Sequence, residues 1–223
     1  MLVGHYAPAL AARPHSGRRP LWALVLGVQA VDVLFFGLVL AGVESASVEP
    51  GRHPRLIVTD GVWSHSLLMT AVYFAVCAAV GWAIRRPREG VALGVAVASH
   101  WLTDLLVHVP DLPVGLAQEP SVGLGLWRWP LLATGIELGL VVAASAYLAR
   151  GWAHARRLWV FTVGLVGVQL LGDFVVPAPE SDAALAPSAF AVYALATAGA
   201  WWVERGRAKI RPAPAAGVAP PGA

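Results

Sequence analysis

The chain has 223 residues, of which 57% are hydrophobic and only 13% are charged, and its mean hydropathy is +0.65. Soluble globular domains usually carry about 25% charged residues, so this composition excludes a disordered chain and argues against a water-soluble enzyme. The pI is near 9.5, but the 16 Lys and Arg residues form no dense basic cluster, which argues against a nucleic-acid partner. The composition therefore predicts an integral membrane protein.

Six apolar stretches are long enough to cross a bilayer, which takes about 20 mostly apolar residues per helix. The chain is therefore predicted to be an all-α, polytopic membrane helix bundle of about six transmembrane helices, with the lipid bilayer as its surroundings. The predicted spans are residues 20–43, 61–84, 90–110, 124–149, 158–177 and 183–203.

Basic residues alternate between the connections of these spans. Of the 16 Lys and Arg residues, 13 lie before the first span, between the second and third, between the fourth and fifth, or after the sixth. The positive-inside rule places these connections in the cytoplasm. Both termini are therefore predicted to be cytoplasmic, in a multi-pass protein of the cell's inner (plasma) membrane. The 13 residues are Arg13, Arg18, Arg19, Arg85, Arg86, Arg88, Arg150, Arg156, Arg157, Arg205, Arg207, Lys209 and Arg211.

The sequence divides into three parts. Residues 1–19 form a short, weakly apolar segment that lies on the membrane interface or re-enters the bundle. Residues 20–204 form the six-helix transmembrane domain. Residues 205–223 are first basic and then rich in Pro and Ala, a composition typical of a disordered tail. The oligomeric state is left open.

The third span contains ionisable residues that a bilayer makes costly. His100, Asp104 and His108 are spaced i, i+4, i+8 and share one helix face. A charge at the centre of a membrane helix costs about 2.5–3.5 kcal/mol on insertion scales, so it needs a partner or a function. An imidazole and a carboxylate one turn apart can begin a metal site but cannot complete it. The same pair could instead form a hydrogen bond between helices.

Other segments offer the missing metal ligands. His65, near the start of the second span, is a third ligand, and Asp32, midway along the first span, is a fourth. His5 adds another if the N-terminal segment folds back. Imidazoles and carboxylates in this ratio suit Zn²⁺, with Mn²⁺ or Fe²⁺ as alternatives. Asp104 or Asp32, whichever lies outside the coordination sphere, is the candidate catalytic base.

Three further polar positions have two interpretations each. His108 lies near the outer interface and is expected to be solvated or structural. Asp173 and Gln169 are expected to join helices by hydrogen bonds. Glu137, one turn after Thr134, has either a structural or a functional role.

Five strings in residues 1–150 resemble a family of bacterial membrane-bound metal-dependent hydrolases: LVGHYAPALAA, GVQAVDVLF, WSHSLLM, ASHWLTDLLVHVPDLP and GLGLWRWP. The resemblance implies a metal-dependent hydrolase. Two departures from the family pattern stand out. Val62-Trp63-Ser64 occupies the place of an Arg before the His-Ser pair, and Asp32 stands alone where the family has two carboxylates. The metal ligands that the resemblance implies are His5, Asp32, His65, His100 and Asp104.

These observations predict a membrane-embedded, metal-dependent hydrolase that acts on a lipid-linked or phosphate ester at the outer-leaflet side. One alternative is a small transporter in which intramembrane acids form a proton or cation relay. A structural membrane protein without catalysis is another, and a haem protein that uses His65 and His100 is a third. The acids of the relay would be Asp32, Asp104, Glu137 and Asp173.

Overall fold

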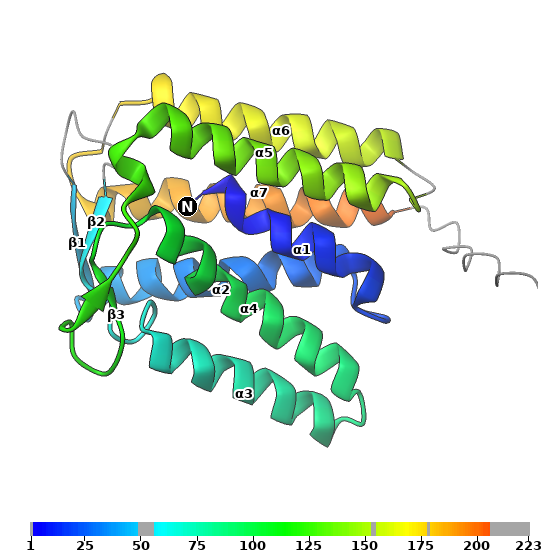
Figure 1. Ribbon diagram of the computed structural model, residues 1–223, viewed down its shortest axis with the longest axis horizontal. Helices are drawn as coiled ribbons and strands as arrows, with labels where there is room; N and C mark the ends of the chain where they lie inside the picture. The colour runs from blue at the N-terminus through cyan, green and yellow to red at the C-terminus, as the bar shows by residue number, and fades with distance from the viewer. Residues whose placement is uncertain (1, 49–55, 153–154, 178, 206–223) are drawn as a thin grey trace, which may run out of the picture.

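Helices dominate the computed structural model, which describes residues 2–48, 56–152, 155–177 and 179–205 (Figure 1). Of the seven α-helices in this part of the chain, α1 (Tyr6–Ala12) is short and α3 (Leu67–Ala83) is an apolar helix of 17 residues. The other five are long and apolar enough to cross a membrane, which confirms the predicted helical class and agrees with the predicted membrane protein. They are α2 (Leu21–Leu40), α4 (Pro87–Val107), α5 (Pro130–Ala149), α6 (Ala155–Phe174) and α7 (Asp182–Glu204).

Several helix boundaries differ from the predicted spans, and three of these differences lie at the candidate site. Helix α3 begins at residue 67 instead of 61 because Ser66 caps it, its side chain accepting a backbone N–H. Helix α4 ends at residue 107 instead of 110, shortly before Pro110. Helix α5 begins at Pro130 instead of residue 124, because proline fits the first turn of a helix. Hydropathy had included these non-helical residues in the spans, and several of them form the candidate site.

The all-α prediction omitted two short antiparallel sheets. Strand β1 (Ser45–Val48) pairs with β2 (Leu56–Asp60), and β3 (Leu112–Pro113) pairs with β4 (Ser121–Val122). The strands have two to five residues, too few for an alternating pattern to identify them in a loop. Both sheets lie at one end of the bundle (Figure 1), called the sheet end below.

The opposite end of the bundle, called the arginine-rich end, carries the connections that are rich in arginine (Figure 1). One of these arginines is buried: Arg13 Nε lies 2.7 Å from Glu204 Oε1, and Glu204 Oε2 accepts a 2.8 Å hydrogen bond from Leu21 N. This contact ties the end of the N-terminal segment to the start of α2 and the end of α7. Residues 206–223, which make up most of the predicted tail, lie outside the described residues.

The N-terminal segment lies in the centre of the bundle, where it contacts α2, α4 and α5 (Figure 1). It consists of a 3₁₀ turn, η1 (Val3–His5), followed by α1. Val3, Tyr6 and Leu10 are fully buried and belong to the main hydrophobic core. The segment therefore carries His5 into the interior of the protein.

Helices α3 and α4 cross at two glycines. A Cβ atom at Gly81 would lie only 2.5 Å from Gly90 Cα, so the two backbones can approach this closely only because both residues are glycine. This close approach fixes α3 against α4, and so fixes the turn before α3 relative to the end of α4. The two segments supply most of the histidines of the candidate site.

Candidate metal centre

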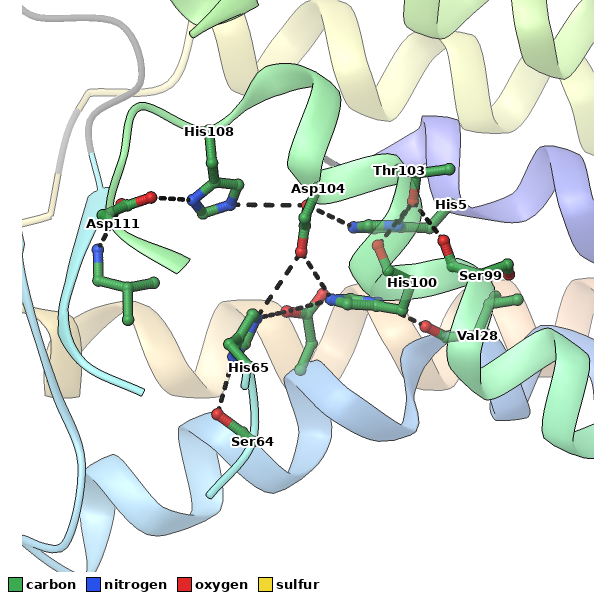
Figure 2. A network of polar contacts seen from close by, with 12 residues as sticks. His5, Val28, Ser64, His65, Ser99, His100, Thr103, Asp104, His108 and Asp111 are labelled. Carbon is green, nitrogen blue, oxygen red and sulfur yellow. Dashed lines mark hydrogen bonds and ion pairs between the residues drawn. The ribbon is translucent and has the colours of Figure 1, made fainter. Parts of the chain in front are cut away.

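The structure brings together all five residues that the sequence predicted as metal ligands (Figure 2). His5 comes from η1, Asp32 from α2, His65 from the turn before α3, and His100 and Asp104 from one face of α4. His100 is fully buried and Asp104 is 1% exposed, whereas the Asp32 side chain is 15% exposed. The cluster lies in the half of the bundle next to the sheet end (Figures 1 and 2).

The carboxylate oxygens of the cluster face the Nε2 atoms of its imidazoles. Asp104 Oδ2 lies 3.0 Å from His100 Nε2 and 3.8 Å from His65 Nε2, and Asp104 Oδ1 lies 3.2 Å from His5 Nε2. Asp32 Oδ1 lies 3.5 Å from His65 Nε2 and 3.4 Å from His100 Nε2. Ligands on a tetrahedral zinc with bonds of about 2.0–2.1 Å are separated by about 3.3–3.4 Å. The observed distances bracket that value.

Two groups of these ligand atoms are compact enough to hold an ion. One group is His5, His100 and Asp104, and the other is Asp32, His65 and His100. Within each group, all ligand atoms lie within 4.8 Å of one another. The two groups share His100.

The outward nitrogen of each central imidazole has a hydrogen-bond acceptor. His100 Nδ1 donates to the Val28 carbonyl at 2.6 Å. His5 Nδ1 lies 2.6 Å from Thr103 Oγ1, and the Thr103 hydroxyl has carbonyl oxygens of Ser99 and His100 to donate to, so it accepts from His5. With the proton on Nδ1, each Nε2 of a neutral ring presents a lone pair to the cluster.

His65 is oriented in the same way by a buried acid that the sequence analysis missed. His65 Nδ1 donates to Ser64 Oγ at 2.7 Å, and the Ser64 hydroxyl donates to Glu44 Oε2 at 2.6 Å. Glu44 Oε1 also accepts the backbone N–H groups of Trp63 and Ser64, at 2.7 and 2.9 Å. Glu44 follows the first predicted span, where a loop acid is normally solvated, but it is only 3% exposed.

The inward nitrogens are left facing carboxylate oxygens. Among the residues that the structure describes, His5 Nε2 and His100 Nε2 are buried and find no hydrogen-bond partner, although each lies close to an Asp104 oxygen. Lone pairs of nitrogen and oxygen that face each other at about 3 Å repel unless a proton or a metal cation lies between them. Imidazoles that donate outward and point their other nitrogen inward are typical of metal ligands with an outer shell of partners. The donor set therefore fits a divalent metal ion.

Two further residues lie near the cluster. Tyr193 on α7 donates to Asp32 Oδ2 at 3.1 Å and so holds that carboxylate. His108 was expected to be solvated or structural, and the solvated interpretation is wrong because the residue is 5% exposed. It is the first residue after α4, with Nδ1 donating to Asp111 Oδ1 at 2.9 Å and Nε2 3.5 Å from Asp104 Oδ1. Its spacing of four residues from Asp104 places it on the side of the cluster, as the helical periodicity predicts.

Polar residues of α5 and α6 anchor the segment that carries His5. Glu137 Oε2 accepts the backbone N–H groups of Leu2 at 2.9 Å and Gly4 at 3.4 Å, and Gln169 Oε1 accepts that of Val3 at 3.1 Å. Asp173 supports this arrangement, since its Oδ2 accepts hydrogen bonds from Gln169 Nε2 at 2.8 Å and Thr134 Oγ1 at 2.6 Å. The expected joining of helices by Asp173 and Gln169 is therefore confirmed, and Glu137 has a structural contact.

A cavity of about 510 Å³ adjoins the cluster. Asp32, His65, Asp104 and His108 line one part of it, and most of its remaining wall is apolar and comes from α2, α6 and α7. Four of its lining residues are exposed on the surface of the protein, near the end of α6, just after it and at the start of α7: Leu171, Val176, Pro177 and Ser188. The cavity therefore reaches the side of the bundle near its sheet end.

Comparison with known proteins adds no relative to this picture. No family model, curated protein or solved structure matches the chain. The membership of a hydrolase family that the five strings imply therefore stays a prediction, and the geometry of the site carries the functional argument.

Proposed function

We propose that this protein is a membrane-embedded, metal-dependent hydrolase of a lipid-linked or phosphate ester. The observation that carries the proposal is the orientation of His5, His65 and His100. All three hold their Nδ1 atoms with outward partners and direct their Nε2 atoms at the carboxylates of Asp32 and Asp104. Zn²⁺ is the preferred ion for this donor set, with Mn²⁺ or Fe²⁺ as alternatives.

The proposed placement in the inner membrane has six spans and both termini in the cytoplasm. Its support is the concentration of arginines at one end of the bundle. Helix α3, with 17 residues, rises only about 26 Å, and the non-helical residues 61–66 extend it toward the sheet end. In this placement the metal centre lies toward the outer leaflet.

The apolar cavity supports a lipid-like substrate. It reaches the side of the bundle between the end of α6 and the start of α7, where the surrounding medium is lipid. An acyl or prenyl chain can lie against the apolar wall while the ester bond reaches the polar wall formed by Asp32, His65, Asp104 and His108.

The chemistry assigned to the chain's own residues begins with the difference between the two acids. Both acids line the cavity, but Asp104 is buried among imidazoles and serves as a ligand, whereas Asp32 is more exposed. A divalent ion supplies a Lewis acid that activates water and polarises the ester. Asp32, held by Tyr193, accepts the proton of the water whose oxygen bonds to the phosphorus or carbonyl carbon. That proton passes to the leaving oxygen as its bond to the phosphorus or carbon breaks.

The experiment measures metal content and hydrolysis on the full-length protein purified in detergent. We expect stoichiometric metal by mass spectrometry, and release of alcohol from at least one member of a panel of phospholipids and polyprenyl phosphates in mixed micelles. His65→Ala and His100→Ala should lose metal and activity together. His15→Ala is the matched control, because His15 is exposed and contacts only Tyr147 among the hydrogen bonds described.

Two results would overturn this proposal. One is wild-type protein without stoichiometric metal after loading with Zn²⁺, Mn²⁺ or Fe²⁺. The other is a metal content that stays unchanged in His65→Ala and His100→Ala. The transporter alternative has less support, because Glu137 and Asp173, half of the predicted relay, hold backbone and side-chain groups of neighbouring segments.

A further inference from the structure

We propose that the centre holds two divalent ions bridged by the carboxylate of Asp104; this inference rests on the metal site of the proposed function. The two oxygens of Asp104 face different imidazoles. Oδ2 lies 3.0 Å from His100 Nε2, whereas Oδ1 lies 3.2 Å from His5 Nε2. A carboxylate that offers one oxygen to each of two ligand sets is arranged as a bridge.

The rings of His5 and His100 indicate the spacing of the two ions. They are stacked, with centroids 3.8 Å apart and planes 12° from parallel, and both Nε2 atoms point toward Asp104 (Figure 2). If each ion is bound to one of these two parallel rings and to a different oxygen of Asp104, the distance between the ions is about the distance between the rings. Paired metal ions in phosphatases and nucleases are about 3.5–4 Å apart, which matches the stacking distance.

The number of ligands also exceeds what one zinc ion usually takes. A structural or catalytic zinc is usually bound by about four ligands, some of which can be water, whereas two overlapping groups of ligand atoms are present here. We assign the first position to His65, His100 and Asp104 Oδ2, beside Asp32. The second position belongs to His5 and Asp104 Oδ1.

His108 marks the second position from its other side. Its Nε2 atom lies 3.5 Å from Asp104 Oδ1, across that oxygen from His5 (Figure 2). Like the other three imidazoles, it donates outward through Nδ1, in this case to Asp111. This outward hydrogen bond fixes the orientation of the ring and keeps Nε2 directed at the second position.

The charge of the cavity supports bound cations. Four carboxylates line it, from Asp32, Asp104, Glu137 and Asp173, and none of its lining residues in the described part of the chain is Lys or Arg. Divalent ions lower the negative charge that this wall presents to a phosphate ester.

The test loads full-length wild-type protein, stripped with a chelator in detergent, with Mn²⁺. We expect two Mn²⁺ per chain by mass spectrometry and a spin-coupled electron paramagnetic resonance spectrum, because ions bridged by one carboxylate interact magnetically. Saturation at one Mn²⁺ with an uncoupled six-line spectrum would overturn the two-ion proposal and leave the proposed function standing. Binding of no Mn²⁺, Zn²⁺ or Fe²⁺ would overturn both.

Variants test the assignment of the two positions. His5→Ala should keep one ion and lose the coupled spectrum, whereas the control His15→Ala should keep two ions and the coupling. Size-exclusion chromatography shows whether each variant is folded, and the wild-type spectrum decides the number of ions if His5→Ala does not fold. A folded His5→Ala protein that still holds two coupled ions would contradict the assignment of His5 to the second position.

Discussion

The buried carboxylate of Glu44 accepts a 2.6 Å hydrogen bond from Ser64, and this contact determines which nitrogen of His65 faces the metal centre. Because the Ser64 hydroxyl donates to Glu44, its oxygen is left to accept from His65 Nδ1. A loop acid that follows the first predicted span therefore sets the orientation of a ligand that precedes α3.

Replacement of Glu44 by Ala should weaken metal binding without removing a ligand. The Ser64 hydroxyl and two backbone N–H groups lose their acceptor, so His65 can rotate or change its tautomer. Loss of such an outer partner costs about 10–100-fold in metal affinity. Competition with a chromophoric chelator for Zn²⁺ measures the change, and Glu180→Ala, at an exposed loop position, is the control. Equal affinities in Glu44→Ala and wild type would contradict the role given to Glu44.

Replacement of Glu137 by Ala should destabilise the bundle and loosen His5. The backbone N–H groups of Leu2 and Gly4 would be left without their acceptor, and each unsatisfied buried group costs about 1–3 kcal/mol. Glu137→Gln keeps an oxygen that can accept these bonds, so its loss of stability should be smaller. The free energy of unfolding in mixed micelles, together with the metal content, separates the two variants. The anchoring role would be untenable if Ala and Gln gave the same small effect.

Replacement of Arg13 by Ala should affect stability and leave the metal centre unchanged. The variant leaves the buried Glu204 without its cation, and breaking a buried ion pair in this way costs about 3–5 kcal/mol. The double variant Arg13→Met, Glu204→Gln removes both charges and should recover much of the loss. Unfolding in mixed micelles measures stability, and a fall in metal content of the folded Arg13→Ala protein would show that the two ends of the bundle are coupled.

Accessibility of introduced cysteines tests the proposed orientation. In a Cys77→Ser background, which removes the single cysteine, Ala183→Cys lies at the sheet end and Gly151→Cys at the arginine-rich end, both at exposed positions. A membrane-impermeant maleimide should label Ala183→Cys in intact cells and Gly151→Cys only after the cells are broken. The reverse pattern would place the metal centre on the cytoplasmic side.

Much of the candidate site could be predicted because its central pair is local in sequence. His100 and Asp104 are one helical turn apart, so periodicity alone puts them on one face. His65 and Asp32 stood out because ionisable groups are rare in apolar segments. The spacing of four residues from Asp104 also indicated His108, but not its burial, which depends on contacts made after α4 ends. Glu44 could not be found in this way, because it lies outside a regular helix and is buried only by contacts with distant segments.

The sequence by itself predicted the membrane surroundings, the helical class and the identity of the central polar residues, because composition and helical periodicity can be read without the fold. Only the tertiary structure decided that the five predicted ligands converge, since His5 reaches Asp104 across almost 100 residues. It also decided which ring nitrogens point inward, because Val28, Thr103 and the Ser64–Glu44 pair are neighbours only in the folded bundle. The low proportion of charged residues, 13%, therefore indicates a membrane protein, and the few charges that the fold places inside form the candidate metal centre.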